Sequence, residues 1–266
     1  MSAVKEPNFF SKIQKIGPSI VFDDENLYLQ LFTKGKGKSI IGEASTSYLY
    51  FKGTEDRIHG FNKESRIIIA LRNPVERAYS HYLMDRDKYG REKYPVHKVL
   101  MDENYIPRYG FHGKMVNPYI YPSKYFDHVN RYIKRFGKEK VKVIFFEEMT
   151  DNQEKIFNDV FNFLGIKTIN INKASRLNEY KKFRSIWIAK ANDFHMLSKI
   201  KTLIPRKVKY GLLNKLIYKN AQKNAIDNDL YRNIYLHHFK NDISNLENLL
   251  EREITKLWRE DNDSKR

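Results

Sequence analysis

The stretch RIIIALRNPVERAYSHY, from Arg66 to Tyr82, joins a continuous apolar run to a polar segment with helical spacing. The apolar run Ile67–Leu71 is short and does not alternate with polar residues, which is typical of a strand buried in a parallel sheet. Asn73 is a good N-cap, Pro74 fits the first helical position, and Glu76 stands where it would complete a capping box. The stretch therefore predicts a buried strand that is followed at once by a capped helix.

Strand and helix patterns alternate along the rest of the chain. Short apolar runs at Ile40–Ile41 and Val141–Phe146 predict further strands. Apolar periodicity and end signals predict three more helices, namely Ser123–Phe136 followed by Gly137, Asn152–Leu164 with Thr150 and Gln153 as a capping box and Gly165 as its stop, and Asp227–Trp258. This order indicates an α/β fold with a largely parallel central sheet flanked by helices. The length fits a single domain over residues 1–266.

The composition favours anionic partners and excludes several kinds of site. Lys and Arg number 49 against 32 Asp and Glu, which gives a formal net charge of +17. The chain has no cysteine, so disulfides, zinc-thiolate sites and cysteine nucleophiles are excluded. We find no run of about 18 apolar residues that would span a membrane, and MSAVKEPNFFSK at the N-terminus lacks the apolar segment of a signal peptide. We therefore expect a soluble, cytoplasmic protein.

Arg72 stands where the predicted strand ends, at the carboxyl edge of the sheet. Open α/β sheets bind their ligands at this edge, and a guanidinium there suits a phosphate. Ser80 lies on the following helix and its hydroxyl can join the same anion. The alternative is a salt bridge of Arg72 and a Ser80 that only packs. The spacing alone leaves both readings open.

The segment RNPVERAYSHY closely resembles the 3′-phosphate-binding motif of sulfotransferases that use 3′-phosphoadenosine 5′-phosphosulfate (PAPS). The resemblance is to the branch that contains heparan sulfate sulfotransferases and their bacterial relatives. It implies a sulfotransferase fold like that of P-loop NTPases, PAPS as co-substrate, and binding of its 3′-phosphate by Arg72 and Ser80. Segment LNEYKKFRS resembles the loop that covers the nucleotide, which implies roles for Lys181, Lys182 and Arg184. Lys182 stands where some members of the family have glycine.

Further segments follow the family order along nearly the whole chain. KEPNFF resembles the segment that carries the catalytic glutamate, which falls on Glu6, and GEASTSYLY resembles the next strand and turn. Members of the family begin with a strand and a phosphate-binding loop of the type K-x-G-T-T-S-L, which would precede KEPNFF. We find no such loop here, so we expect a domain that lacks the first strand and the phosphosulfate loop. Gly37-Lys38-Ser39 in TKGKGKSIIG lacks the upstream glycine of a P-loop, and we interpret it as a solvated basic turn.

The resemblance implies sulfuryl transfer with Glu6 as the general base and Lys5 beside an anionic acceptor or sulfonate. Acceptor contacts are expected from the long, loop-rich region Lys88–Pro122, which contains Arg108 and His112.

Several side roles and function classes stay open at this point. Glu43 could orient the Glu6 region, pair with a cation or be structural, and His81 is a second candidate base. No metal-binding pattern occurs among the eight histidines, so we expect no metal. The expected function is a PAPS-dependent sulfotransferase acting on a carbohydrate or another hydroxyl or amine compound. One alternative is a truncated or inactive relative that only binds nucleotide or anionic glycan. A weaker one is a basic nucleic-acid-binding protein, which no recognition motif supports.

Overall fold

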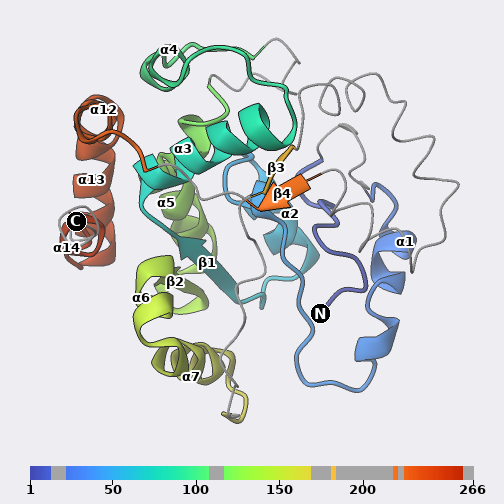
Figure 1. Ribbon diagram of the computed structural model, residues 1–266. Coiled ribbons are helices and arrows are strands. Elements are labelled where there is room, and N and C mark those ends of the chain that lie inside the picture. Colours follow the sequence, from blue (N-terminus) through green and yellow to red (C-terminus); the bar gives the residue numbers. More distant parts are fainter. Residues whose placement is uncertain (13–21, 108–116, 169–180, 184–217, 221–224, 260–266) are drawn as a thin grey trace, which may run out of the picture.

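The computed structural model of the protein describes residues 1–12, 22–107, 117–168, 181–183, 218–220 and 225–259 (Figure 1). In chain order, its helices and strands are α1 (Glu25–Gln30), α2 (Thr54–Phe61), β1 (Ile67–Leu71), α3 (Pro74–Leu83), α4 (Val96–Met101), α5 (Tyr125–Phe136), β2 (Val141–Phe145), α6 (Phe146–Asp151), α7 (Gln153–Leu164), β3 (Lys181–Phe183), β4 (Tyr218–Asn220), α12 (Asn228–Ile234), α13 (Lys240–Leu250) and α14 (Thr255–Arg259). The C-terminal helices α12 to α14 and the N-terminal segment with α1 lie on opposite sides of β1 and β2 (Figure 1).

The central strands β1 and β2 are parallel, in register from Ile67 opposite Val141 to Leu71 opposite Phe145. Strands β3 and β4 form a separate antiparallel pair. Within the described strands, β1 pairs with β2 alone. The parallel pair with flanking helices confirms the predicted α/β class.

Two strand expectations were wrong in part. Segment Ile40–Ile41 forms no strand, and its two side chains are exposed, so this apolar pair lacks the neighbouring strand that would bury it. The strand at Ile67–Leu71 is buried on one face only. Ile69 and Leu71 are buried, whereas Ile68 is 39% exposed. Alternate side chains of a strand point to opposite faces, so an unbroken apolar run does not prove that both faces are covered.

The junction between β1 and α3 forms as the sequence predicts, except for the capping box. The Asn73 carboxamide oxygen accepts hydrogen bonds from the backbone amides of Val75 and Glu76, both at 3.1 Å, and Pro74 is the first residue of α3. The backbone N–H of Asn73 donates instead to a carboxylate oxygen of Glu147 at 2.8 Å. Since a residue distant in sequence occupies this donor, Glu76 does not close a box.

Two other helices form where they were predicted and keep their predicted stops, but the capping box predicted for α7 does not form. Helix α7 ends at Gly165, which is left-handed with φ 70°, and Gly137 ends α5. Asn152 caps α7 through the backbone N–H of Lys155, whereas the Thr150 hydroxyl donates to the carbonyl of Glu147. The predicted Thr150–Gln153 box was therefore wrong, because the short helix α6 occupies the residues before Asn152.

The C-terminal segment is not the single helix Asp227–Trp258 that its periodicity predicts. A π-helical turn over Tyr235–Phe239 separates α12 from α13, and α13 stops where Glu251 takes a left-handed φ of 51°. Glu247 then accepts the backbone amides of Ile254 at 2.7 Å and Thr255 at 2.6 Å, which starts α14 in a new direction. Apolar spacing survives such a break, so periodicity alone could not reveal it.

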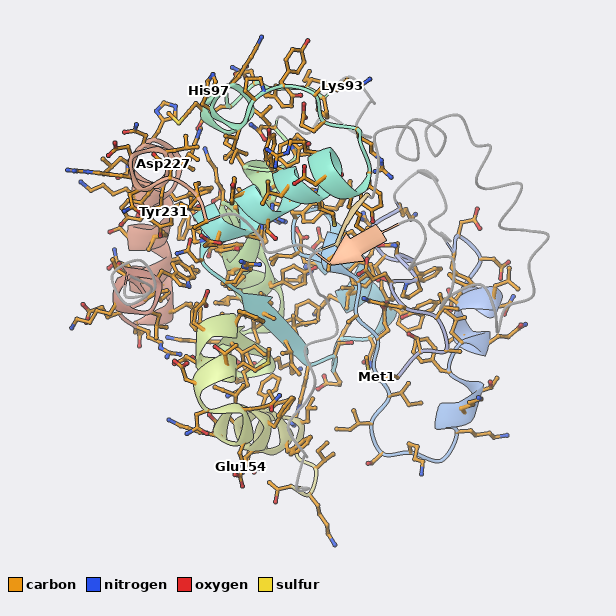
Figure 2. The ribbon with its side chains drawn as sticks, viewed as in Figure 1. Met1, Lys93, His97, Glu154, Asp227 and Tyr231 are labelled. Atoms are coloured by element: carbon orange, nitrogen blue, oxygen red, sulfur yellow. The ribbon has the colours of Figure 1, made fainter. Side chains whose placement is uncertain are left out.

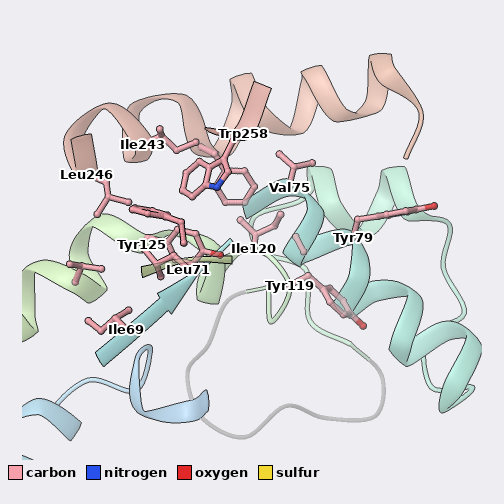
Figure 3. Packing of buried hydrophobic residues seen from close by; sticks show 14 of the residues in the cluster. Ile69, Leu71, Val75, Tyr79, Tyr119, Ile120, Tyr125, Ile243, Leu246 and Trp258 are labelled. Carbon is pink, nitrogen blue, oxygen red and sulfur yellow. The ribbon is translucent and has the colours of Figure 1, made fainter. Parts of the chain in front are cut away.

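The core lies between the buried face of β1 and helices α3, α5 and α13. Figure 3 shows Trp258 of α14 packed with Tyr125 of α5 and Leu71 of β1. Region Lys88–Pro122, which we expected to be mostly loop, contains α4, and Val99 and Leu100 of that helix are fully buried. No helix within the described ranges has the length and apolar character needed to cross a bilayer.

Asp242 of α13 fixes the start of α5 from across the core. Its carboxylate accepts the backbone amides of Tyr125 at 2.7 Å and Phe126 at 3.3 Å. Burial raises the pKa of Asp242 to about 6, and the two amides oppose that shift without cancelling it. The folded protein therefore holds a proton on Asp242 more tightly than the unfolded chain does.

We predict that Asp242→Asn increases stability at pH 7.5 and changes it little at pH 4. With a pKa near 3.9 when unfolded, the wild-type carboxyl loses stability as pH rises from about 4 to about 6, by about 2–3 kcal/mol. Asparagine keeps an acceptor for the two amides and carries no charge. Urea unfolding of both proteins across this range isolates the difference. A variant that is less stable than wild type at pH 7.5 would show that the ionised carboxylate stabilises the fold.

Candidate functional site

Arg72 follows β1 at the carboxyl ends of both parallel strands. The residues around it enclose a cavity of about 130 Å³, lined by Ala70, Leu71, Arg72, Ile144, Phe145, Phe146 and Met149. The guanidinium carbon lies 5.8 Å from the centroid of the Phe146 ring. The position agrees with the ligand-binding edge of open α/β sheets.

The guanidinium of Arg72 has few partners among the residues that the structure describes. Its only ion pair among the described residues is with Glu76, at 3.8 Å between Nη2 and a carboxylate oxygen. Both side chains are about one-third exposed, so this contact contributes little. The Nε atom is buried and has no hydrogen-bond partner among the described residues. A buried donor without a partner costs free energy, which an external anion at this position would relieve.

The backbone that carries Arg72 is held by three separate parts of the chain. Glu147, just after β2, accepts the Asn73 backbone amide, and its second carboxylate oxygen accepts the Trp258 indole N–H at 3.2 Å. The Asn73 carboxamide nitrogen donates to the Tyr231 hydroxyl at 2.7 Å and to the Trp258 carbonyl at 3.1 Å. Tyr231 projects from α12 on the side of the molecule that carries the C-terminal helices (Figure 2).

Tyr125 of α5 adds a further support to this backbone. Its hydroxyl donates to the Arg72 carbonyl at 3.0 Å. Burial raises the pKa of Tyr125 to about 12, so the phenol keeps its proton at neutral pH. The Arg72 backbone is thus fixed by α5, α6 and the C-terminal helices, while its side chain stays available.

Arg77 is a second cation at this junction that the sequence reading did not single out. Its Nε donates to the Ser123 hydroxyl at 2.6 Å and its Nη2 to the Tyr119 carbonyl at 2.8 Å. No carboxylate of the described residues forms an ion pair with it. Burial lowers the pKa of Arg77, and the positive charge of Arg72 lowers it further. The sequence feature that could have identified Arg77 is a charged residue placed between Val75 and Ala78, two apolar positions of the buried side of the helix.

Ser80 lies on α3 four residues after Glu76, so the two share one face of the helix. Arg72 precedes the Asn73 N-cap and contacts this face through its ion pair with Glu76 at 3.8 Å. The Ser80 side chain is half-buried. Glu76 lies between the two predicted phosphate ligands, so an anion that bridges them would displace the long Arg72–Glu76 contact.

Glu6 reaches the same region from the N-terminal segment. It is half-buried, and one of its carboxylate oxygens accepts the Thr46 hydroxyl at 3.3 Å. The Tyr50 phenol is affected by charges from both parts of the site. Burial raises the pKa of Tyr50, the charge of Arg77 opposes that rise, and the charge of Glu6 adds to it. One phenol therefore lies within electrostatic range of both Glu6 and Arg77.

The other predicted site residues are described to different extents. Lys5 is exposed beside Glu6. Lys181 and Lys182 lie in β3, paired with β4, where the sequence predicted a loop, and their side chains are outside the described part. Arg184, Arg108 and His112 lie outside the described residues.

The structure argues against His81 as a base. Burial lowers the pKa of His81 to about 3, and nearby Arg77 and Arg91 lower it further. Such an imidazole is neutral at pH 7 but accepts a proton too weakly for efficient general base catalysis. No group of three or more potential metal-ligating side chains occurs within the described ranges. Lys36 and Lys38 of the basic turn are exposed.

Comparison with known proteins agrees with the geometry. Residues 57–207, more than half of the chain, match the profile of the family described as the sulfotransferase domain. The structure is similar to the crystal structure of a sulfotransferase from Alicyclobacillus acidocaldarius, with 25% identity and a TM-score of 0.68. The match covers 97% of this chain and 87% of that chain. No curated protein sequence matches.

We predict that Asn73→Ala destabilises the protein by about 2–3 kcal/mol, more than a single N-cap usually contributes. The change removes the cap of α3 and also the two bonds from the Asn73 carboxamide to the Tyr231 hydroxyl and the Trp258 carbonyl, which then keep, among the described residues, only the bond between them at 3.3 Å. Asn152→Ala is the matched control, because that asparagine caps α7 at the surface through one amide and is expected to cost about 1 kcal/mol. Equal losses in urea unfolding would mean that the bonds to α12 and α14 contribute nothing.

Proposed function

The chain belongs to the sulfotransferase domain family, and we propose that it moves a sulfuryl group from PAPS to a hydroxyl or amine of a carbohydrate acceptor. The family and the fold support sulfuryl transfer in general. The donor, the acceptor and the residue roles are our proposal.

One observation carries the donor assignment. Arg72 stands at the carboxyl ends of two parallel strands with a buried Nε that has no partner among the described residues. A phosphate monoester offers that fork two negatively charged oxygens, and bidentate arginine contacts with phosphate are strong. The 3′-phosphate distinguishes PAPS from other adenine nucleotides, so Arg72 would select the donor.

Two neighbours on α3 reinforce this assignment. Ser80 supplies a hydroxyl on the face of α3 that carries Glu76, the ion-pair partner of Arg72, and Arg77 adds a second positive charge without an ion-paired carboxylate in the described residues. We assign Lys181, Lys182 and Arg184 to the cover of the nucleotide on the strength of the family motif alone.

Glu6 is the proposed general base. Its carboxylate lies within electrostatic range of Tyr50, which is also in range of Arg77. In the transfer step, the acceptor oxygen bonds to sulfur as the bond from sulfur to the 5′-phosphate oxygen breaks. The acceptor proton passes to Glu6, and 3′-phosphoadenosine 5′-phosphate (PAP) leaves. Alignment of the reacting atoms and stabilisation of charge dominate such a step.

The acceptor side is proposed from charge and position. Lys5 is exposed next to Glu6, and the net charge of +17 favours acidic acceptors such as anionic glycans. Arg108 and His112 are further candidate acceptor contacts by their place in the sequence.

We predict that Arg72→Ala weakens binding of PAP by about tenfold to 150-fold and hardly changes binding of 5′-AMP. A charge-assisted bond contributes about 1.5–3 kcal/mol, and only PAP carries the 3′-phosphate. Calorimetry with both nucleotides provides the measurement. Arg66→Ala, at the other end of β1, is the matched control and is expected to bind both normally. Equal losses for PAP and 5′-AMP would remove Arg72 from the 3′-phosphate site.

We predict that Glu6→Gln lowers the rate of sulfate transfer from PAPS by about 100- to 10,000-fold and leaves PAP affinity nearly unchanged. Glutamine keeps the shape of the side chain but cannot take up the proton of the substrate that receives the sulfate. The control is Glu25→Gln, an exposed change at the start of α1. Near-normal turnover of Glu6→Gln would show that another group is the base. A wild-type protein that binds PAP but transfers no sulfate would favour the alternative, a relative that only binds nucleotide.

A further inference from the structure

We propose that Glu43 is a positioning residue that holds the segment Glu6–Phe10, called the strap below, through two hydroxyl relays. The proposal rests on the proposed function, in which Glu6 is the base. Glu43 does not touch the reacting atoms in this scheme. It fixes the backbone that carries Glu6.

Each relay runs from a backbone amide of the strap through one hydroxyl to the Glu43 carboxylate. In the first, the Asn8 amide donates to the Ser45 hydroxyl at 3.1 Å, and that hydroxyl donates to Glu43 Oε2 at 3.1 Å. In the second, the Phe10 amide donates to the Tyr48 hydroxyl at 3.2 Å, and that hydroxyl donates to Glu43 Oε1 at 2.6 Å. The two relays use both oxygens of one carboxylate.

The strap needs such support because it belongs to no helix or strand. Glu6 and Asn8 have positive φ angles of 52° and 56°, a conformation that residues other than glycine adopt only when their surroundings enforce it. The Asn8 side chain adds local bonds. It donates to the Glu6 carbonyl at 2.7 Å and accepts the Ser47 hydroxyl at 2.6 Å. Asn8 is buried, so these groups cannot turn to water instead.

The relays require that both carboxylate oxygens of Glu43 accept a hydrogen bond. Each hydroxyl already accepts a backbone N–H, so its own proton is directed toward Glu43. An ionised carboxylate accepts both protons, whereas a carboxamide has one oxygen and one donating nitrogen. Burial raises the pKa of Glu43, and the hydrogen bonds from Tyr48, Ser45 and Tyr28 act against that rise.

The same turn also contacts the Glu6 side chain. Thr46 follows Ser45 in the short 3₁₀ turn Thr46–Tyr48, and its hydroxyl donates to the Glu6 carboxylate at 3.3 Å. Glu43 therefore locks the turn to the strap backbone at two points, and the turn then contacts the proposed base. A loosened strap would leave Glu6 present but misplaced, and small displacements of a reacting group reduce rates strongly.

The chain offers a matched pair of variants. The hydroxyls of Tyr48 and Tyr28 both donate to Glu43 Oε1, at 2.6 and 3.2 Å. Only Tyr48 also accepts a strap amide among the described residues. Tyr28→Phe keeps the ring that stacks on Phe9 at 4.2 Å between centroids. Each change removes one oxygen atom from the surroundings of Glu43, and only Tyr48→Phe breaks a relay.

We predict that Tyr48→Phe lowers kcat for sulfate transfer from PAPS by about 10- to 100-fold, with KM for PAPS and PAP affinity within about twofold of wild type. Tyr28→Phe is expected to keep kcat within about threefold. A general loss of packing would move Tm and all kinetic constants together, so the split between kcat and KM separates positioning from simple destabilisation. Equal effects of the two variants, or no effect of Tyr48→Phe, would overturn the proposal.

A second pair of variants, at Ser45, tests the proposal if Tyr48→Phe folds poorly. Ser45→Ala breaks the other relay and is expected to lower kcat, whereas Ser45→Thr keeps a hydroxyl and is expected to restore most of it. A Ser45→Ala enzyme with normal kcat would overturn the proposal. The failure of the proposed function looks different. If Glu6→Gln remains active, Glu6 is not the base, whatever the relay variants do. If Glu6→Gln is inactive and the relay variants are normal, the function stands and the relay role fails.

Discussion

The Glu147 carboxylate joins the parts of the molecule that must stay together for Arg72 to point at the sheet edge. One of its oxygens accepts the Asn73 backbone amide directly after β1, and the other accepts the Trp258 indole of α14. Glu147 itself follows β2. The carboxyl ends of the two parallel strands and the C-terminal helices are therefore tied by one side chain. Asn73 strengthens the tie through Tyr231 and the Trp258 carbonyl. The site thus depends on residues far from it in sequence.

At the junction between β1 and α3, the backbone polar groups are bonded within the protein, whereas the charged arginine side chains are left for a ligand. Backbone donors and acceptors are satisfied within the protein, since Asn73 is bonded to Glu147 and the Arg72 carbonyl accepts Tyr125. The guanidinium groups of Arg72 and Arg77 have no strong ion pair among the described residues, and the positive charge of Arg72 lowers the pKa of Arg77. An anion bound near both groups would offset this repulsion. This arrangement suits a site for a multiply charged ligand better than a purely structural one.

Sequence reasoning succeeded where the controlling signals are local. The strand Ile67–Leu71, the Asn73 cap and the glycine stops at Gly137 and Gly165 follow from adjacent residues and appear in the structure. It failed where distant residues compete for the same groups. Glu147 takes the donor that Glu76 was expected to bind, and Glu247 redirects the chain after α13. The strap could be located by resemblance to a family motif, but its left-handed residues and the relays to Glu43 arise from long-range contacts that no periodicity encodes.

The two halves of the candidate site differ in how firmly the fold specifies them. The arginine half is built on a strand end and a capped helix, elements that form from local preferences and a shared core. The Glu6 half is an irregular segment whose geometry is imposed by side chains of one short turn. In the proposed function, the first half would supply the rigid, charged cradle that donor binding needs. The second half would supply the carboxylate for proton removal only while its relays hold. With the roles proposed for Glu6 and Arg72, changes in the turn would alter turnover before they alter nucleotide affinity, because the turn is bonded to the strap backbone and to the Glu6 carboxylate.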